Sequence, residues 1–200
     1  AHFAPGEREA ARRSLGLAAD GMVVGIVATL RSWKGHTYLL DAFAGLADHQ
    51  ARLLIVGDGP QREALQARIA ELGLGERVIM PGNQRDVLPW LQALDVFVLP
   101  SYANEGVPQA LLQAMLCGLP VISTPVGSIT EVVEHQRTGL IVEPRQAAPL
   151  HAALERLLGD ADLRRSQGEA GLAEGRARFG LDAMLDKMSA VFAEAVAHRG

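Results

Sequence analysis

The sequence is poor in cysteine, in aromatic residues and in excess charge of either sign. Cys117 is the single cysteine among 200 residues, which excludes an internal disulfide and a four-cysteine zinc site. The 19 lysines and arginines nearly balance the 23 aspartates and glutamates, so the formal net charge is only -4. Because no dense basic run is present, neither nucleic acid nor an anionic membrane surface is expected as the main partner.

Long hydrophobic runs are also missing. Apolar stretches such as Leu53–Val56 and Val96–Leu99 are far shorter than the roughly 20 residues that span a bilayer. No direct membrane span is therefore expected. The chain begins without methionine or a charged and then apolar leader, and we interpret it as part of a longer cytoplasmic protein.

The composition is that of a globular protein, with 48% hydrophobic and 21% charged residues. The length predicts one domain over residues 1–200. Short runs rich in valine and isoleucine alternate with longer segments of helical period, as in parallel strands covered on both faces by helices. We therefore expect an α/β fold, a Rossmann-like open parallel sheet with helices on both faces. The expected strands are 22–29, 52–57, 77–80, 95–99, 120–123 and 139–142. The expected helices are 36–48, 60–73, 86–93, 107–117, 127–135, 146–158 and the last forty residues.

Several familiar motifs are incomplete. Gly57-Asp58-Gly59 follows a strand, but the third glycine of a dinucleotide fingerprint would fall on Arg62. Lys34-Gly35 has the reverse of the order that a phosphate loop of nucleotide hydrolases needs. The histidines are scattered and never four residues apart, so no metal site is expected. Asp160-Ala161-Asp162 is interpreted as a solvated helix start rather than a metal site.

The loop after the fourth strand, Pro100–Gln109, carries the clearest candidate site, because ligands in such sheets bind at the carboxyl ends of the strands. Pro108 suits the first position of the next helix, where its missing N–H is no loss. The backbone N–H groups of Gly106, Val107 and Gln109 would then be free. A helix start of this kind binds phosphate.

Three polar side chains accompany this helix start. Glu105 either stabilises the helix dipole by about 0.3–1 kcal/mol or contacts a part of the ligand that bears hydroxyl groups. We favour the second, because a carboxylate beside a phosphate would otherwise repel the ligand; a sugar joined to a diphosphate satisfies both features. Gln109 and Gln113 share one face of an apolar helix and bond either to neighbouring backbone or to the ligand.

Other candidates lie in the loops after the first and third strands. Arg31 and Lys34 are either ordinary surface charges or, as we favour, cations that neutralise a diphosphate, arginine as a bidentate fork and lysine as a point charge. The amide of Asn83 suits the edge of a nucleotide base, although a plain turn explains this segment equally well.

In their order along the chain, these motifs resemble one family. It comprises the retaining nucleotide-sugar glycosyltransferases of the GT-B fold, family 4, or glycosyl transferases group 1. The resemblance runs from about Val23 to Phe179 and corresponds to the carboxyl-terminal, donor-binding half. The matching segments are Leu30 to Gly35, Val56 to Pro60, Val96 to Ser101, Glu105-Gly106, Cys117 to Ile122, Gly127 to Glu131 and Thr138 to Leu140.

The resemblance implies a role for each matching position. The family has two glutamates separated by seven residues; the first matches Glu105, a catalytic residue that would hold the hydroxyls of the donor sugar. The second falls on Gln113, which can still hydrogen-bond the ribose but carries no charge. Lys34-Gly35 matches directly, whereas Thr29 replaces an arginine of the family, and Arg31 would serve in its place.

The remaining implied positions concern backbone groups and one further loop. The amides of Gly106 and Val107 would bind the diphosphate, so no metal and no other cofactor is expected. Gly127-Ser128 lies where the family often has two glycines, and Glu131 matches the glutamate that follows them.

The implied reaction is transfer of a sugar from a nucleoside-diphosphate-sugar to an acceptor hydroxyl, with retention of anomeric configuration. This chain would supply the donor-binding half and be inactive without the missing N-terminal acceptor-binding domain. Any contact with the inner face of a membrane would be peripheral and made through that missing half. Two alternatives stay open, a non-catalytic nucleotide-binding module and a non-hydrolysing nucleotide-sugar epimerase.

Overall fold

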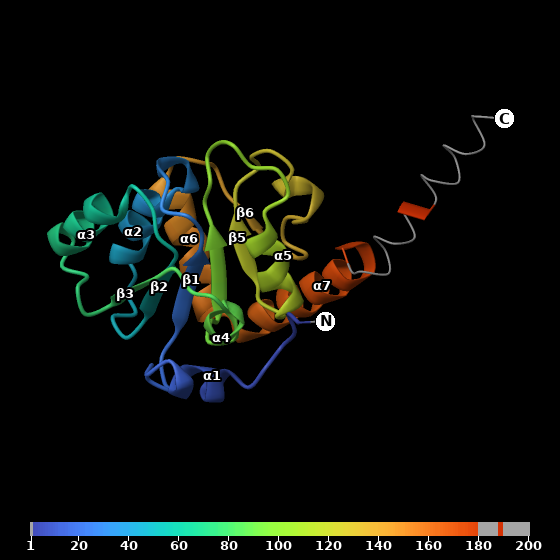
Figure 1. The fold of residues 1–200 in the computed structure, drawn as a ribbon, viewed down its shortest axis with the longest axis horizontal. Helices are drawn as coiled ribbons and strands as arrows, with labels where there is room; N and C mark the ends of the chain where they lie inside the picture. The colour runs from blue at the N-terminus through green and yellow to red at the C-terminus, as the bar shows by residue number, and fades with distance from the viewer. Residues whose placement is uncertain (1, 180–187, 190–200) are drawn as a thin grey trace.

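Six parallel strands form one open sheet in the computed structural model, which describes residues 2–179 and 188–189 (Figure 1). The order β3-β2-β1-β4-β5-β6 places the third strand at one edge. All strands are parallel, and the sequence order of the strands reverses between β1 and β4. This is the order of a doubly wound sheet, and it confirms the predicted Rossmann-like α/β fold. The strands are β1 (Val23–Val27), β2 (Arg52–Val56), β3 (Val78–Gly82), β4 (Val96–Leu99), β5 (Val121–Ser123) and β6 (Gly139–Ile141).

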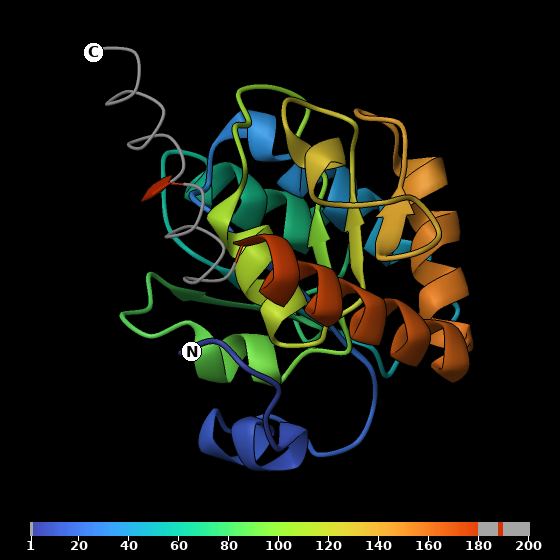
Figure 2. The same ribbon diagram turned by 90° about the vertical axis from the view of Figure 1, so that its right-hand side faces the viewer.

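Helices cover both faces of the sheet. On one face α2 (His36–Ala44) packs against α3 (Arg62–Glu71) and α6 (Ala147–Gly159). On the other face α5 (Gln109–Leu116) lies beside α7 (Ala161–Phe179), as Figure 2 shows. Below the amino ends of the strands, α1 (Arg8–Ser14) packs against α4 (Leu88–Gln92).

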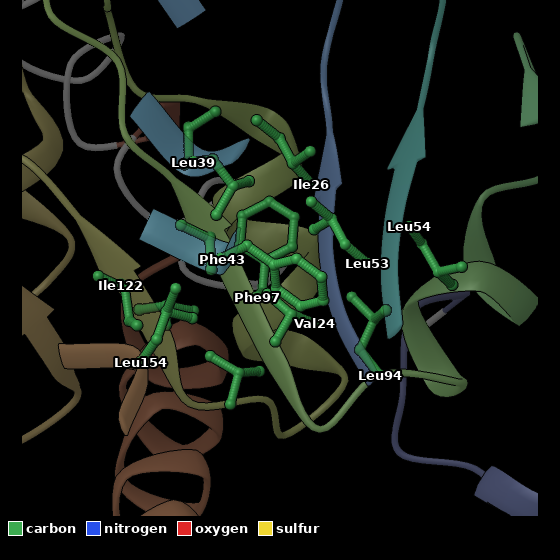
Figure 3. Packing of buried hydrophobic residues seen from close by; sticks show 14 of the residues in the cluster. Val24, Ile26, Leu39, Phe43, Leu53, Leu54, Leu94, Phe97, Ile122 and Leu154 are labelled. Atoms are coloured by element: carbon green, nitrogen blue, oxygen red, sulfur yellow. The ribbon is translucent and has the colours of Figure 1, made fainter. Parts of the chain in front are cut away.

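Strands β1, β2, β4 and β5 are almost completely buried because helices cover them on both sides, whereas the edge strand β3 is partly exposed. Val24 pairs with Leu53 on one side and with Val96 on the other. Phe43 of α2 and Phe97 of β4 are fully buried members of the same apolar cluster (Figure 3). Burial of each such side chain contributes about 1.5–3 kcal/mol, so this cluster supplies the rigid base from which the loops project.

Two expected helices differ from the structure. The segment predicted as a helix over 127–135 contains only one 3-10 turn, Ile129–Glu131, because Gly127 adopts a left-handed backbone with a φ of 58°. The helix after β4 begins at Gln109, so Pro108 is the extended residue before the helix and not its first residue; its φ and ψ are -71° and 119°.

Two helical segments remain to be compared with the sequence. Helix α1 was not predicted, since its seven residues carry little apolar periodicity of their own. The last forty residues were predicted to be helical, and α7 confirms this as far as Phe179. The rest of that prediction lies outside the described residues, except for Met188 and the residue after it.

Candidate functional site

The loops that follow β1, β4 and β5 meet at the carboxyl edge of the sheet, at the top of Figure 1. The amide of Tyr102 donates a hydrogen bond to the carbonyl of Trp33, with an N–O distance of 2.8 Å. This bond joins the loop after β4 to the loop after β1. It brings together the two loops that carry most of the predicted site residues.

Two glycines allow these loops to approach closely. Gly35 has a φ of 77°, and a Cβ atom there would lie 2.1 Å from the carbonyl oxygen of Pro100. At Gly127 a Cβ atom would lie 1.8 Å from the carbonyl oxygen of Glu105. Any larger residue at either position would push the loops apart, because these contacts are with backbone atoms that cannot rotate away.

A partly buried ion pair forms at the centre of this region. The Lys34 ammonium lies 2.6 Å from Oε1 of Glu105, although 71 positions separate the two residues in the chain. The Glu105 side chain is only 4% exposed, whereas that of Lys34 is 20% exposed. The carboxylate is thus largely covered by protein, while the ammonium keeps more access to solvent and to any ligand that enters.

Two hydroxyl groups connect Glu105 to the end of β5. Ser101, which is fully buried, donates a hydrogen bond from its hydroxyl to the same Oε1 atom of Glu105. The hydroxyl of Thr124, also buried, donates in turn to the backbone carbonyl of Ser101. Neither Ser101 nor Thr124 was predicted as a site residue from the sequence, because nothing in their local pattern distinguishes them from other residues at strand ends.

The start of α5 lies open beside the ion pair. Gly106 and Val107 are exposed, and no heavy atom from outside the immediate chain lies within 4 Å of a Cβ built on Gly106. Within residues 2–179, the backbone amides of Gly106, Val107 and Gln109 make no hydrogen bond. Unpaired amides at the start of an eight-residue helix can donate hydrogen bonds to an anionic oxygen.

The other predicted residues are spread around this centre. Arg31 is exposed and its guanidinium lies 5.6 Å from the centre of the Trp33 ring. Gln109 is exposed and Gln113 half-buried, one turn apart on α5. Asn83 is exposed in the loop after β3, at the far edge of the sheet and two strands from β1. The structure therefore brings Lys34 to Glu105 but shows no contact between Asn83 and that pair.

A buried histidine follows the lysine-glycine pair directly. His36 is the first residue of α2, and neither of its ring nitrogens has a hydrogen-bond partner within residues 2–179. Burial lowers the pKa of His36 to about 4; the Arg31 backbone opposes this effect and the charge of Lys34 adds to it. The ring is thus neutral at pH 7, and it places no second positive charge beneath the Lys34 loop.

Two expected absences can be compared with the described part of the chain. In residues 2–179 and 188–189, no group of three or more histidine, cysteine, aspartate or glutamate side chains could hold a metal ion. The same residues include no helix long and apolar enough to cross a membrane. Asp160 accepts a hydrogen bond from the amide of Leu163, as the interpretation of this segment as a helix start requires.

Solved structures of similar fold define the class of protein. HepE of Anabaena in complex with UDP and glucose superimposes with a TM-score of 0.90 and 26% identity, over 96% of this chain and 54% of that chain. Sucrose-phosphate synthase of Thermosynechococcus elongatus gives a TM-score of 0.88 and 32% identity, over 98% of this chain and 50% of that chain. The fold is that of one half of a GT-B glycosyltransferase.

Sequence comparison shows the family. The family model for glycosyl transferases group 1 matches residues 7–173, and the chain belongs to this family. It is 36% identical over 165 residues to 2-deoxystreptamine glucosyltransferase of Streptomyces kanamyceticus, covering 80% of this chain and 42% of that protein. It is 32% identical over 207 residues to D-inositol 3-phosphate glycosyltransferase of Thermobispora bispora, covering 97% of this chain and 48% of that protein. The chain therefore spans about half the length of these relatives.

Proposed function

We propose that this chain is the donor-binding half of a retaining glycosyltransferase of family 4, and that its substrate is a nucleoside-diphosphate-sugar. The observation that carries the proposal is the pairing of a buried carboxylate, Glu105, with a partly exposed cation, Lys34, beside an open helix start. One ligand needs all three features. A diphosphate requires the cation and the free amides, and the attached sugar requires a hydrogen-bond acceptor for its hydroxyls.

Departure of the nucleoside diphosphate is the step that these residues would assist. Negative charge builds up on the leaving oxygen as the bond to the sugar breaks, and fixed donors around that oxygen stabilise it. Lys34, the amides of Gly106 and Val107, and Arg31 are donors that lie in the loops at the carboxyl ends of the strands. With these cations and amides present, we propose that the transfer requires no metal ion.

The carboxylate of Glu105 would orient the sugar. It accepts hydrogen bonds at Oε1 from Lys34 and Ser101, which leaves Oε2 for the sugar hydroxyls. A fixed acceptor lowers the barrier because the sugar reaches the reacting geometry without further loss of entropy. Gln113, which lies on α5, would contact the ribose as an uncharged hydrogen-bonding group.

Transfer would require a second domain that binds the acceptor. The chain spans 42% and 48% of two curated relatives, and GT-B enzymes work in a cleft between two halves. We propose that the isolated chain binds donor without transferring its sugar. The cytoplasmic location expected from the sequence remains part of this proposal.

A ligand panel tests the proposal. The melting temperature of the chain is measured alone and with UDP, GDP, ADP and the corresponding nucleotide sugars. One nucleotide series should stabilise the chain, by roughly 2.7 kcal/mol at a ligand concentration of about 100 times the dissociation constant. AMP and inorganic phosphate serve as controls for charge alone. If no nucleoside diphosphate shifted the melting temperature, the donor-binding function would be rejected.

Activity measurements on a protein that carries both halves separate the two alternatives. A non-catalytic module would bind nucleotide, yet a protein that carries both halves would transfer no sugar. An epimerase would convert the nucleotide sugar without any acceptor, and product analysis after incubation with donor alone would reveal the isomer. The glycosyltransferase family match over residues 7–173 favours transfer over both.

A further inference from the structure

In the described part of the chain, two side chains donate hydrogen bonds to the carboxylate of Glu105. Lys34 and Ser101 both donate to Oε1 of Glu105, the ammonium from 2.6 Å. The two donors differ in freedom. Lys34 lies on a flexible stem and is partly exposed, whereas Ser101 is fully buried at the end of β4.

A bound diphosphate would compete for only one of these donors. Lysine is a mobile point charge, and a phosphate that enters beside the start of α5 would draw its ammonium toward the phosphate oxygens. Loss of that partner would leave the buried carboxylate of Glu105 without its cation, and a buried carboxylate needs other donors to remain in place. Ser101 is the second donor that the structure provides.

The position of Ser101 is itself fixed from the next strand. Its backbone carbonyl accepts a hydrogen bond from the hydroxyl of Thr124, which is buried directly after β5. Gly127 closes the same loop against the carbonyl of Glu105. The hydrogen bonds from Thr124 to Ser101 and from Ser101 to Glu105 thus connect the carboxylate to the sheet. Both hydroxyl residues are fully buried, so a bound phosphate would not compete for them as it would for Lys34.

We propose that Ser101 is a positioning residue that holds the carboxylate of Glu105 toward the donor sugar while Lys34 is occupied by the diphosphate, with Thr124 fixing Ser101 in turn. This inference rests on the proposed function, because it assigns Lys34 to the phosphates and Glu105 to the sugar. It predicts that loss of the Ser101 hydroxyl weakens recognition of the sugar more than recognition of the nucleotide.

Calorimetry of the chain with UDP and with UDP-glucose tests this inference, since the ratio of the two dissociation constants isolates the contribution of the sugar. For Ser101→Ala we expect UDP to bind within about threefold of the original chain. The preference for UDP-glucose over UDP should fall by about tenfold, or disappear where it is smaller, as expected for loss of a hydrogen bond to a charged group. A purely structural role would weaken both ligands equally and leave the ratio unchanged.

Neighbouring residues provide matched controls. Ser123 is also fully buried, and its hydroxyl donates to the backbone carbonyl of Leu99 at 2.7 Å, so Ser123→Ala removes the hydrogen bond of a buried serine hydroxyl away from Glu105. This variant should keep the original ratio. Thr124→Val should lower the ratio less than Ser101→Ala does, and Thr124→Ser, which keeps the hydroxyl, should restore it.

The possible outcomes distinguish this inference from the proposed function. If the original chain prefers UDP-glucose and Ser101→Ala keeps that preference, the role of Ser101 is rejected while donor binding stands. If the original chain binds both ligands equally, the sugar contact of Glu105 and the role of Ser101 fail together. If it binds no nucleotide in the panel, the proposed function itself fails.

A ligand-free measurement tests the bond between Ser101 and Glu105 independently. Urea denaturation of Ser101→Ala, Glu105→Ala and the double variant should give non-additive changes in the midpoint, because both single changes remove the same hydrogen bond. Strictly additive midpoints would reject the coupling that the proposed role requires, even without nucleotide.

Discussion

Two buried carboxylates lie at opposite edges of the sheet, and their surroundings differ. Asp95, at the amino edge, is 3% exposed and is held by Arg8 and by Arg12, whose guanidinium lies 2.6 Å away. It also accepts a hydrogen bond from the amide of Val23 at 2.7 Å. Glu105, at the carboxyl edge, is buried to almost the same extent but receives both its donors at one oxygen.

The cations differ in the same way as the carboxylates. Arg12 also donates to the carbonyls of Ala93, Ala19 and Gly21, so every nitrogen of its guanidinium makes a hydrogen bond. Lys34 has one acceptor within the described residues and keeps access to solvent. The pair of Arg12 and Asp95 connects α1 to the sheet, and an exchange of partners there would break several hydrogen bonds at once. A partly bonded pair can exchange partners, which is the property that a ligand site needs.

The largest expected effect concerns the pair of Arg12 and Asp95 at the amino ends of the strands. Arg12→Ala would leave Asp95 buried without its main partner, and removal of one member of such a pair costs about 3–5 kcal/mol. Urea denaturation should show this loss in the free energy of unfolding, while the folded fraction still binds nucleotide. Arg13→Ala is the matched control on the same helix, because Arg13 is exposed and, among the described residues, pairs with Glu9 alone; it should change stability by less than about 0.5 kcal/mol. Equal losses for both variants would contradict the structural role of the amino edge.

The next effect concerns the unpartnered histidine at the open edge. The pKa of His36 is about 4 in the folded chain and 6.5 in the unfolded chain. Between these two pH values the unfolded chain therefore binds more protons than the folded chain. His36 therefore contributes full stability above pH 6.5, and this contribution falls as the pH drops toward 4, by about 3 kcal/mol in all.

Unfolding free energies at pH 7.5 and pH 4.5 measure this contribution. His36→Leu should show a smaller loss between the two pH values than the original chain does. His49→Gln, a change at an exposed histidine, should leave the difference as it was. An unchanged pH dependence in His36→Leu would show that the buried ring does not titrate as described.

A third effect concerns Glu105 in a protein that carries both halves. Glu105→Gln keeps the size of the side chain and removes its charge, so the orientation of the sugar should suffer while the diphosphate remains bound. We expect transfer to fall by about a hundredfold, in line with loss of one fixed group in a catalytic site. Nucleotide affinity should change by less than about threefold. Full transfer activity in this variant would exclude the role of Glu105 toward the sugar.

The smallest of these effects is on nucleotide binding by the chain itself. Lys34→Ala should raise the dissociation constant for UDP by about thirtyfold, because a charge-assisted contact with the diphosphate is lost. Arg165→Ala removes an exposed cation on α7 and serves as the control for net charge; it should bind UDP as before. Unchanged calorimetry for Lys34→Ala would remove this residue from the site and end the comparison with Arg12.

Much of the fold could be predicted because its signals are local. Alternating apolar runs indicated all the strands of the sheet to within a few residues, as for β1 and β4. The helix expected over 127–135 was wrong because the left-handed Gly127 presses against Glu105, a contact with a distant segment. Helix α1 was not predicted, because its seven residues have little apolar periodicity and the ion pair that connects it to the sheet, Arg12 with Asp95, joins distant positions of the chain.

The site was predicted as a set of loops, and its internal contacts were not. Glu105 and Lys34 were both identified as candidates, but no spacing in the sequence indicates that they contact each other. Ser101 and Thr124 were not identified, since a hydroxyl after a strand has no distinctive pattern. The roles of Asn83, Gln109 and Gln113 stay predictions.

The sequence by itself determined the layers of this protein, because hydrophobic period and turn residues act over a few neighbouring positions. It also determined that polar loops follow the buried strands. Only the tertiary structure decided which charges are joined, Lys34 with Glu105 across 71 positions and Arg12 with Asp95 across 83. The physical reason is that the partner of a buried charge depends on how closely two loop backbones approach, and that approach is set by contacts between distant residues.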